Sequence, residues 1–265
     1  MKNAAALLEE YSMKRIISFF LCVLMTAALL AGCSDRKQRT TWIIAVDGDF
    51  SPFVCADANG KAVGLDVELL DAIARDQNFR YELRPSDWDT AMSVFTSHQA
   101  QVLMGSIASS QERIDGGWFF SHSFYNGVTQ SMAMEPSSDT DTLEDLAGKA
   151  VAVVSGTLGA AYAESVKDKY GFSIATFSDS HSMYAAVLEG RAAACFEDTP
   201  ALRDSIAGGV ALELVPGSEG AASDYCVAIC DEKDRPFLEL FNQGLANIRA
   251  NGIYDAILAK YADTL

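Results

Sequence analysis

The segment from Gly105 to Arg113 contains residues whose types and spacing suit the binding of a small anion. The apolar run from Val102 to Met104 predicts a strand, and Ser109 with Glu112 has the spacing of a capping box at the start of a helix. Free backbone N–H groups at a helix start, together with the guanidinium of Arg113, make an anion receptor. A guanidinium meets a carboxylate as a planar fork, so a small carboxylate is the anion that this segment suits best.

The composition restricts the class of protein. A chain of 265 residues has room for one large domain or two of ordinary size, and its 49% hydrophobic residues supply a substantial core. The net charge of −16 argues against nucleic-acid binding, which requires clustered cations. The glycine-containing turns match no phosphate-binding loop, and the three histidines lack ligand spacing. We therefore expect no nucleotide, no metal and no other cofactor.

The N-terminal segment has the pattern of an export signal. Lys14 and Arg15 precede a charge-free, mostly apolar run from Ile16 to Ala31, and Met13 is an alternative start. The sequence Leu-Ala-Gly-Cys that ends at Cys33 resembles the lipobox of bacterial lipoproteins. This resemblance implies a signal peptide over residues 1–32 and a lipidated Cys33 with a polar tether over 33–41. The protein would then lie outside the cytoplasm, anchored to the bacterial cell membrane; an ordinary signal peptide that contains a cysteine is the alternative.

Strand and helix patterns alternate along the rest of the chain and predict an α/β fold with two similar halves. The expected strands are 42–46, 81–83, near 102, 150–154, 174–177, 192–196 and 225–229. The expected helices are 67–73, 88–95, one ending near 169, 180–188, one starting at 199, 234–250 and 252–261. This order favours mainly parallel sheets covered on both faces.

The cysteines after the signal segment are expected to be free and buried thiols. Cys226 and Cys230 lie on one extended segment, about 13 Å apart at strand spacing, so they cannot pair with each other. A disulfide that involves Cys55 or Cys195 stays open as the alternative.

Several motifs along residues 42–265 together resemble family 3 of the bacterial solute-binding proteins, which capture polar amino acids for ABC importers. The motifs are Asp47-x-x-Phe50-x-Pro52-Phe53, Gly64 to Leu69, Asp87-Trp88, Ser106 to Arg113, Leu143 to Lys149, Val153 to Thr157, Gly190 to Asp198, Asn242-x-x-Leu245, Gly252-x-Tyr254, Ile257 and Lys260-Tyr261. The resemblance implies the type II periplasmic-binding-protein-like fold, with two α/β lobes joined by two hinge strands. Lobe 1 would comprise 42–128 and 223–265 and lobe 2 would comprise 129–222, with the ligand in the cleft between them.

The same resemblance implies a role for several charged and backbone groups. Arg113 matches the arginine that grips the α-carboxylate of the ligand, and the N–H groups of Ala108 and Leu158 match donors to that carboxylate. Asp198 matches the acid that accepts the α-ammonium, and the carbonyl of Ser106 matches a second acceptor. Physical chemistry supports the pair of Arg113 and Asp198, since a zwitterion that leaves water needs one cation and one anion on the protein. The alternative for Asp198 is a helix N-cap.

The remaining matches concern the side chain of the ligand. Phe50 and Trp88 match aromatic residues that pack against the ligand side chain, and Asp47 lies where the end of that side chain is recognised. Packing in the core is the alternative for both aromatic residues. Most relatives have a hydroxyl residue at Ala108, and some have a polar reader at Val154. These two departures point to an unusual amino acid or another small carboxylate as the ligand.

The leading hypothesis is therefore an extracytoplasmic lipoprotein, monomeric, that binds an amino acid and delivers it to an ABC permease. A sensor that signals through a partner would use the same site. Dehydratases acting on prephenate or arogenate share the fold and use a cleft carboxylic acid. Glu197 adjoins Asp198, but strand alternation directs their side chains to opposite faces, so we expect no spare acid in the cleft and no enzyme.

Overall fold

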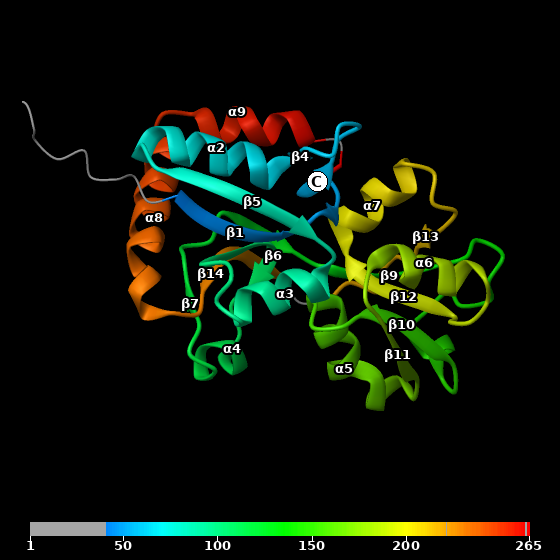
Figure 1. Ribbon diagram of the computed structural model, residues 1–265. Coiled ribbons are helices and arrows are strands. Elements are labelled where there is room, and N and C mark those ends of the chain that lie inside the picture. Colours follow the sequence, from blue (N-terminus) through cyan, green and yellow to red (C-terminus); the bar gives the residue numbers. More distant parts are fainter. Residues whose placement is uncertain (1–40, 221, 263) are drawn as a thin grey trace, which may run out of the picture. The chain divides into compact units, whose positions relative to one another are not determined.

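The computed structural model describes residues 41–220, 222–262 and 264–265 (Figure 1). The predicted signal peptide, Cys33 and most of the tether lie outside the described residues. The strands of the described residues form two larger sheets and a small three-stranded sheet. No helix within 41–220, 222–262 and 264–265 is both long enough and apolar enough to cross a membrane.

The first sheet has the strand order β5-β1-β6-β14-β7, with β8 also paired to β14. β1 runs parallel to β5 and β6, whereas β14 runs antiparallel to β6, β7 and β8. These strands are β1 Thr41–Asp47, β5 Arg80–Ser86, β6 Val102–Ala108, β7 Phe119–Phe120, β8 Tyr125–Val128 and β14 Ser223–Ile229. The small sheet follows β1 and is formed by β2 Asp49–Phe50, β3 Val54–Ala56 and β4 Ala62–Val63.

Helices cover the first sheet because its strands alternate two apolar faces. Ile44 and Val46 pack in the core that contains residues of α2 and α8, whereas Ala45 packs with residues of α3. In Figure 1, α2, α8 and α9 lie together beside this sheet, and α3 lies in front of it. The helices and turns of this part are α2 Leu65–Gln77, α3 Trp88–Thr96, α4 Gln111–Asp115, η2 Glu232–Asp234, α8 Arg235–Ala250, α9 Ile253–Leu258 and η3 Ala259–Tyr261.

The second sheet has the order β11-β10-β12-β9-β13, and β10 runs parallel to β11 and β12. β9 runs antiparallel to β12 and β13. The elements of this part are β9 Gln130–Met134, η1 Glu144–Leu146, β10 Ala150–Val154, α5 Leu158–Tyr170, β11 Ser173–Phe177, α6 Ser180–Leu188, β12 Ala194–Asp198, α7 Thr199–Ala207 and β13 Glu213–Leu214.

Most predicted elements are present, and two expectations need correction. The sheets are mixed, not mainly parallel, because β14 and β9 enter them in the opposite direction. The strand expected over 192–196 is β12 at Ala194–Asp198, so Asp198 is its last residue and also directly precedes α7. The first sheet draws its strands from 41–128 and 223–229 and the second from 130–214. The exact lobe boundaries stay a prediction.

The described cysteines are free, as predicted, but only two of them are buried. Cys195 and Cys226 are buried, whereas Cys55 and Cys230 are partly exposed. The expectation of buried thiols is therefore wrong for Cys55 and Cys230.

Phe237→Ala should destabilise the protein by about 3–5 kcal/mol, because it leaves a cavity among packed aromatic rings. Phe237 is fully buried and has ring contacts with Trp42, Phe79 and Phe241. Urea unfolding measures the change. The control is Leu188→Ala, because Leu188 is 40% exposed. This substitution should lower the free energy of unfolding by about 0.5 kcal/mol or less. Equal effects of the two substitutions would contradict this assignment of the core.

Candidate functional site

A closed cavity lies between the two sheets and receives side chains from both. The part that contains the first sheet contributes Asp47, Phe50, Trp88, Gly105 and Arg113 to its lining. The part that contains the second sheet contributes Val154, Gly156, Thr157, Leu158, Ser180, Glu197 and Asp198. The cavity is narrow: the centre of a water molecule has about 20 Å3 in which to move, little more than one water needs. A larger molecule can enter only when the two sheets separate, as in a hinged protein.

Helix starts position several of these residues. α3 begins at Trp88 after its N-cap Asp87, which accepts a hydrogen bond from the N–H of Thr90 at 2.9 Å. α5 begins at Leu158 after the N-cap Thr157, and α6 begins at Ser180 after the N-cap Asp179. Short polar caps that satisfy the first free N–H groups therefore fix where each helix begins at the cavity.

Gly159 allows α5 to start against β12. A Cβ at this position would lie 2.5 Å from the carbonyl oxygen of Phe196, a distance that no real side chain tolerates. The absence of a side chain thus brings the beginning of α5 next to the end of β12, where Glu197 and Asp198 lie.

Arg113 joins the two sheets directly. Its Nη1 donates to the carbonyl of Ala108 at 2.7 Å, and its Nη2 donates to the carbonyl of Gly156 at 3.0 Å. The guanidinium carbon also lies 5.6 Å from the ring centre of Trp118. Burial lowers the pKa of Arg113, but a guanidinium stays charged in proteins. Arg113 is therefore a partly buried cation that links the two parts of the molecule.

The helix that carries Arg113 is capped one residue later than expected. Ser110, not Ser109, is the N-cap of α4, and its Oγ accepts from the N–H of Arg113 at 3.2 Å. The predicted capping box of Ser109 and Glu112 is therefore wrong. The sequence alone is compatible with either serine as the N-cap. In the structure, β6 pairs with β14 up to Ala108, and the helix begins after Ser110.

Asp198 is held by hydrogen bonds from both parts of the molecule. Gln130 Nε2 donates to its Oδ1 at 3.0 Å, and the hydroxyl of Tyr225, on β14, donates to its Oδ2. Asp198 occupies the N-cap position of α7, as the alternative predicted, but its side chain makes no capping hydrogen bond. Burial raises the pKa of Asp198 to about 6, against the opposing effect of the two donors.

Glu197 lines the same cavity as Asp198, and the expectation that it points away from the cleft is wrong. Asp198 ends β12, where the backbone turns into α7, so the alternation of side chains along a strand no longer applies. Ser180 Oγ donates to Glu197 Oε2 at 2.6 Å, and the Asp198 N–H donates to Oε1 at 3.2 Å. Burial, and then the charge of Asp198, raises the pKa of Glu197 to about 8.

Asp47 is the third carboxyl group of the cavity. It ends β1, and its Oδ1 accepts from the N–H of Asp49 at 3.1 Å. Burial, together with the charges of Asp49, Asp87 and Asp179, raises its pKa to about 6 against the opposing effect of the Asp49 N–H. An acidic region therefore surrounds this end of the cavity.

Two aromatic rings enclose the cavity from the side of the first sheet. Phe50 and Trp88 are 7% and 5% exposed, and Phe50 stacks on Phe53 with ring centres 5.7 Å apart. Gly156, with φ of +72°, brings its backbone close to Trp88: a Cβ there would lie 3.5 Å from the indole Nε1. These contacts join the ring of Trp88 to the turn before α5.

The structure brings together Asp47, Phe50, Trp88, Arg113, Leu158 and Asp198, six of the residues predicted for the site. Ala108 instead lines a neighbouring groove and approaches the cavity through its carbonyl bond to Arg113. Ser106 lies on β6 directly after Gly105, which lines the cavity. Their roles in ligand binding stay predictions.

Ser180 and Glu197 are lining residues that sequence reasoning did not assign to the site. The available signals were the helix start after Asp179 and the position of Glu197 next to Asp198. Neither signal shows that the two side chains meet, because 17 residues separate them in the chain.

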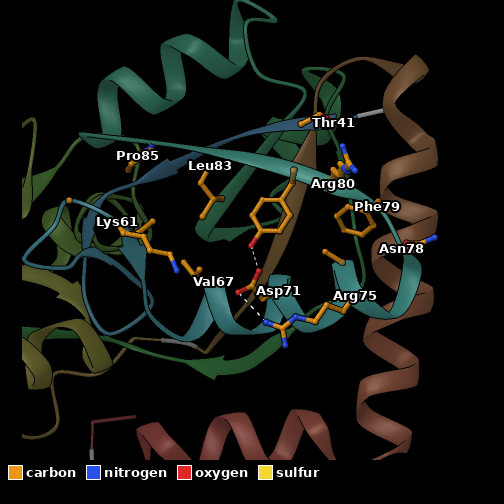
Figure 2. A pocket seen from close by; sticks show the side chains of 14 residues that line it. Thr41, Lys61, Val67, Asp71, Arg75, Asn78, Phe79, Arg80, Leu83 and Pro85 are labelled. Carbon is orange, nitrogen blue, oxygen red and sulfur yellow. Dashed lines mark hydrogen bonds and ion pairs between the residues drawn. The ribbon is translucent and has the colours of Figure 1, made fainter. Parts of the chain in front are cut away.

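A second, more open groove lies between α2 and β5 (Figure 2). It holds about 900 Å3 and includes Lys61, Arg75 and Arg80. Asp71 in this groove accepts from Tyr81 Oη at 2.5 Å and pairs with Arg75 at 3.5 Å. Figure 2 shows these contacts between side chains of α2 and β5. This groove is lined only by the first sheet and its neighbours, whereas the narrow cavity receives side chains from both sheets, so the cavity is the better candidate site.

The model of the bacterial extracellular solute-binding proteins, family 3, matches residues 42–264. The chain belongs to this family. It is 25% identical over 261 residues to the lysine/arginine/ornithine-binding periplasmic protein of Escherichia coli, covering 91% of this chain and 96% of that protein.

Solved structures of substrate-binding and arginine-binding proteins agree with the fold. The second substrate-binding domain of a putative amino acid ABC transporter from Streptococcus pneumoniae is 34% identical, with a TM-score of 0.58; 83% of this chain and 99% of that one are covered. A mutant of ArgBP from T. maritima is 27% identical, with a TM-score of 0.74 and coverage of 85% and 96%. The fold is that of type II periplasmic binding proteins, as the sequence predicted.

The ligand-free protein should lose stability as the pH rises from 5 to 8. A carboxyl group whose pKa is raised by folding stabilises the folded state fully below its unfolded pKa, and this contribution is lost as pH rises through the folded pKa. For Glu197 the window runs from about 4.5 to about 8, and one pKa unit corresponds to about 1.4 kcal/mol. Thermal unfolding should therefore show a Tm that falls across this window, with a smaller fall in Glu197→Gln. An equal fall in both proteins would contradict the assignment.

Proposed function

We propose that the protein binds an amino acid in the cavity between the two lobes, through Arg113 and Asp198. The observation that carries this proposal is a partly buried cation and a buried anion in one narrow cavity, each bonded to both parts of the molecule. The α-carboxylate of an amino acid would take the place of the two carbonyls now bonded to Arg113, with the N–H groups of Leu158 and Ala108 as further donors. The α-ammonium would bind Asp198 and the carbonyl of Ser106.

The walls of the cavity suit the rest of an amino acid. Phe50 and Trp88 offer apolar ring faces to the stem of the side chain, and Asp47 lies near its end. Binding from an open state would draw the lobes together, because Arg113 and Asp198 come from different sheets. The lobes would be 42–128 with 223–265 and 129–222.

The protein would deliver its ligand to an ABC importer from outside the cytoplasm. The Streptococcus pneumoniae domain described above belongs to a putative amino acid ABC transporter, and the Escherichia coli relative is periplasmic. The lipobox that ends at Cys33 supports a lipid anchor in the bacterial membrane, with residues 34–41 as a tether. We expect a monomer. A sensor that reports ligand binding to a membrane partner would use the same cleft.

Arg113→Ala and Asp198→Asn should each abolish the thermal stabilisation that the best amino acid of a screen gives the wild-type protein. Each substitution removes hydrogen bonds to a charged group, worth about 1.5–3 kcal/mol, or roughly ten- to a hundredfold in affinity per bond. Differential scanning fluorimetry with a panel of amino acids and small carboxylates measures the shift. Arg84→Ala is the matched control, since Arg84 is exposed on β5 and pairs with Glu82. Near wild-type affinity in both cleft variants would refute the proposal.

A dehydratase is the second candidate, and the position of Glu197 is the observation that favours it. A cleft carboxyl with a raised pKa is suited to act as a general acid. The family relatives described above are binding proteins, so we expect no turnover. Incubation of the purified protein with prephenate, followed by detection of its dehydration product, tests this directly. Product formation that is lost in Glu197→Gln would overturn the binding assignment.

A further inference from the structure

The cavity holds more negative than positive side chains. Asp47, Glu197 and Asp198 line it, whereas Arg113 is the single Lys, Arg or His among the described residues that do so. No ion pair within the described part of the chain involves any of these three carboxyl groups. A zwitterion that binds Arg113 and Asp198 would leave Asp47 and Glu197 without a counter-charge.

Asp47 and Glu197 line the same cavity from opposite sheets. The charge of Asp47 acts on Glu197, and the charges of Asp87 and Asp179 act on Asp47. Glu197 is 2% exposed, so bulk water cannot solvate its negative charge once the cleft is closed. This end therefore attracts a cation.

The groups that face Glu197 supply no cation of their own. Ser180 donates its hydroxyl from α6, and Tyr184 lies on the same helix. Cys195 and Asp198 face it from β12, and Asp47 faces it from β1. The groups that bond to Glu197 or act on its charge are thus neutral or negative.

We infer that Glu197 is a specificity-determining residue that, with Asp47, binds a second cationic group at the end of the ligand side chain. This inference rests on the proposed function and narrows its substrate class to amino acids with a side-chain amine or guanidine. Trp88 and Phe50 form the walls along which an apolar stem would lie, and aromatic faces also attract cations.

The inference follows from the cost of burying unbalanced charge. A neutral amino acid would close the cleft over two unpaired carboxyl groups, which must then stay protonated or destabilise the closed state. An acidic amino acid would add a third negative charge beside them. A cationic side chain instead pairs with both carboxylates, and it leaves the closed cavity with one net negative charge where a neutral amino acid would leave two.

Isothermal titration calorimetry at pH 8 tests the inference with matched ligands. L-lysine, L-ornithine and L-arginine are compared with L-norleucine, which keeps the carbon chain of lysine and lacks its side-chain amine. We expect at least one cationic ligand to bind a hundredfold or more tightly than L-norleucine. Glu197→Gln, whose amide oxygen can still accept from Ser180, should weaken that cation at least tenfold and change L-norleucine binding less than threefold. Glu213→Gln is the matched control, because Glu213 is exposed on β13.

Proton release separates this role from a structural one. Burial raises the pKa of Glu197 to about 8 in the ligand-free cavity, and a bound cation favours its charged form. The wild-type protein should therefore release protons on binding a cation at pH 7, and its affinity should rise from pH 6 to pH 8. Titrations in buffers of different ionisation enthalpy measure the release, which should shrink in Glu197→Gln.

Each outcome decides the matter. If L-norleucine or L-glutamine binds within threefold of every cation, or if Glu197→Gln leaves cation affinity and proton release unchanged, the inference is wrong and the proposed function stands. If no amino acid binds, both fail. Asp47→Asn removes the other charge from the opposite sheet, and it serves as the test if Glu197→Gln does not fold.

Discussion

Charge balance in a narrow cavity is the constraint on which the rest of this structure depends. A partly buried guanidinium and buried carboxyl groups are stable only with well-placed hydrogen-bond partners. Arg113 finds two of its partners in backbone carbonyls, one from each side of the cavity. Asp198 finds a hydroxyl of β14 and an amide of β9. The same bonds that satisfy these charges therefore hold the two sheets together.

The surrounding fold serves to deliver those groups to one place. The strand β1 of the first sheet and the strand β10 of the second sheet both end at the cavity. The helices α3, α5 and α6 begin there after capped turns. The missing side chain of Gly159 allows α5 to lie against β12. Polar chemistry is thus carried by strand ends and helix starts, while the alternating apolar faces of the strands are buried under helices. This division is the usual one in open α/β sheets.

The sequence predicts much of this arrangement, and its failures have physical causes. Periodicity places most helices within one or two residues, because each buries one face, as α8 does through Phe237 and Phe241. The sequence predicts the strand β14 but not its antiparallel direction, since hydrophobic alternation is the same in parallel and antiparallel strands. The strand β9 at Gln130–Met134 is not among the predicted elements. The bond from Arg113 to Gly156 spans 43 residues and depends on how the two sheets meet. The alternation of side chains along a strand predicts that Glu197 points away from the cavity. This prediction fails because β12 ends at Asp198, and α7 begins directly after it.

A crystal structure of the protein with the amino acid that stabilises it most is the most direct test of the central claim. We expect the ligand in the cavity, with its α-carboxylate on Arg113 and its α-ammonium on Asp198. Its side-chain cation should lie between Asp47 and Glu197. A ligand bound in the groove between α2 and β5, or with its carboxylate turned away from Arg113, would contradict the claim.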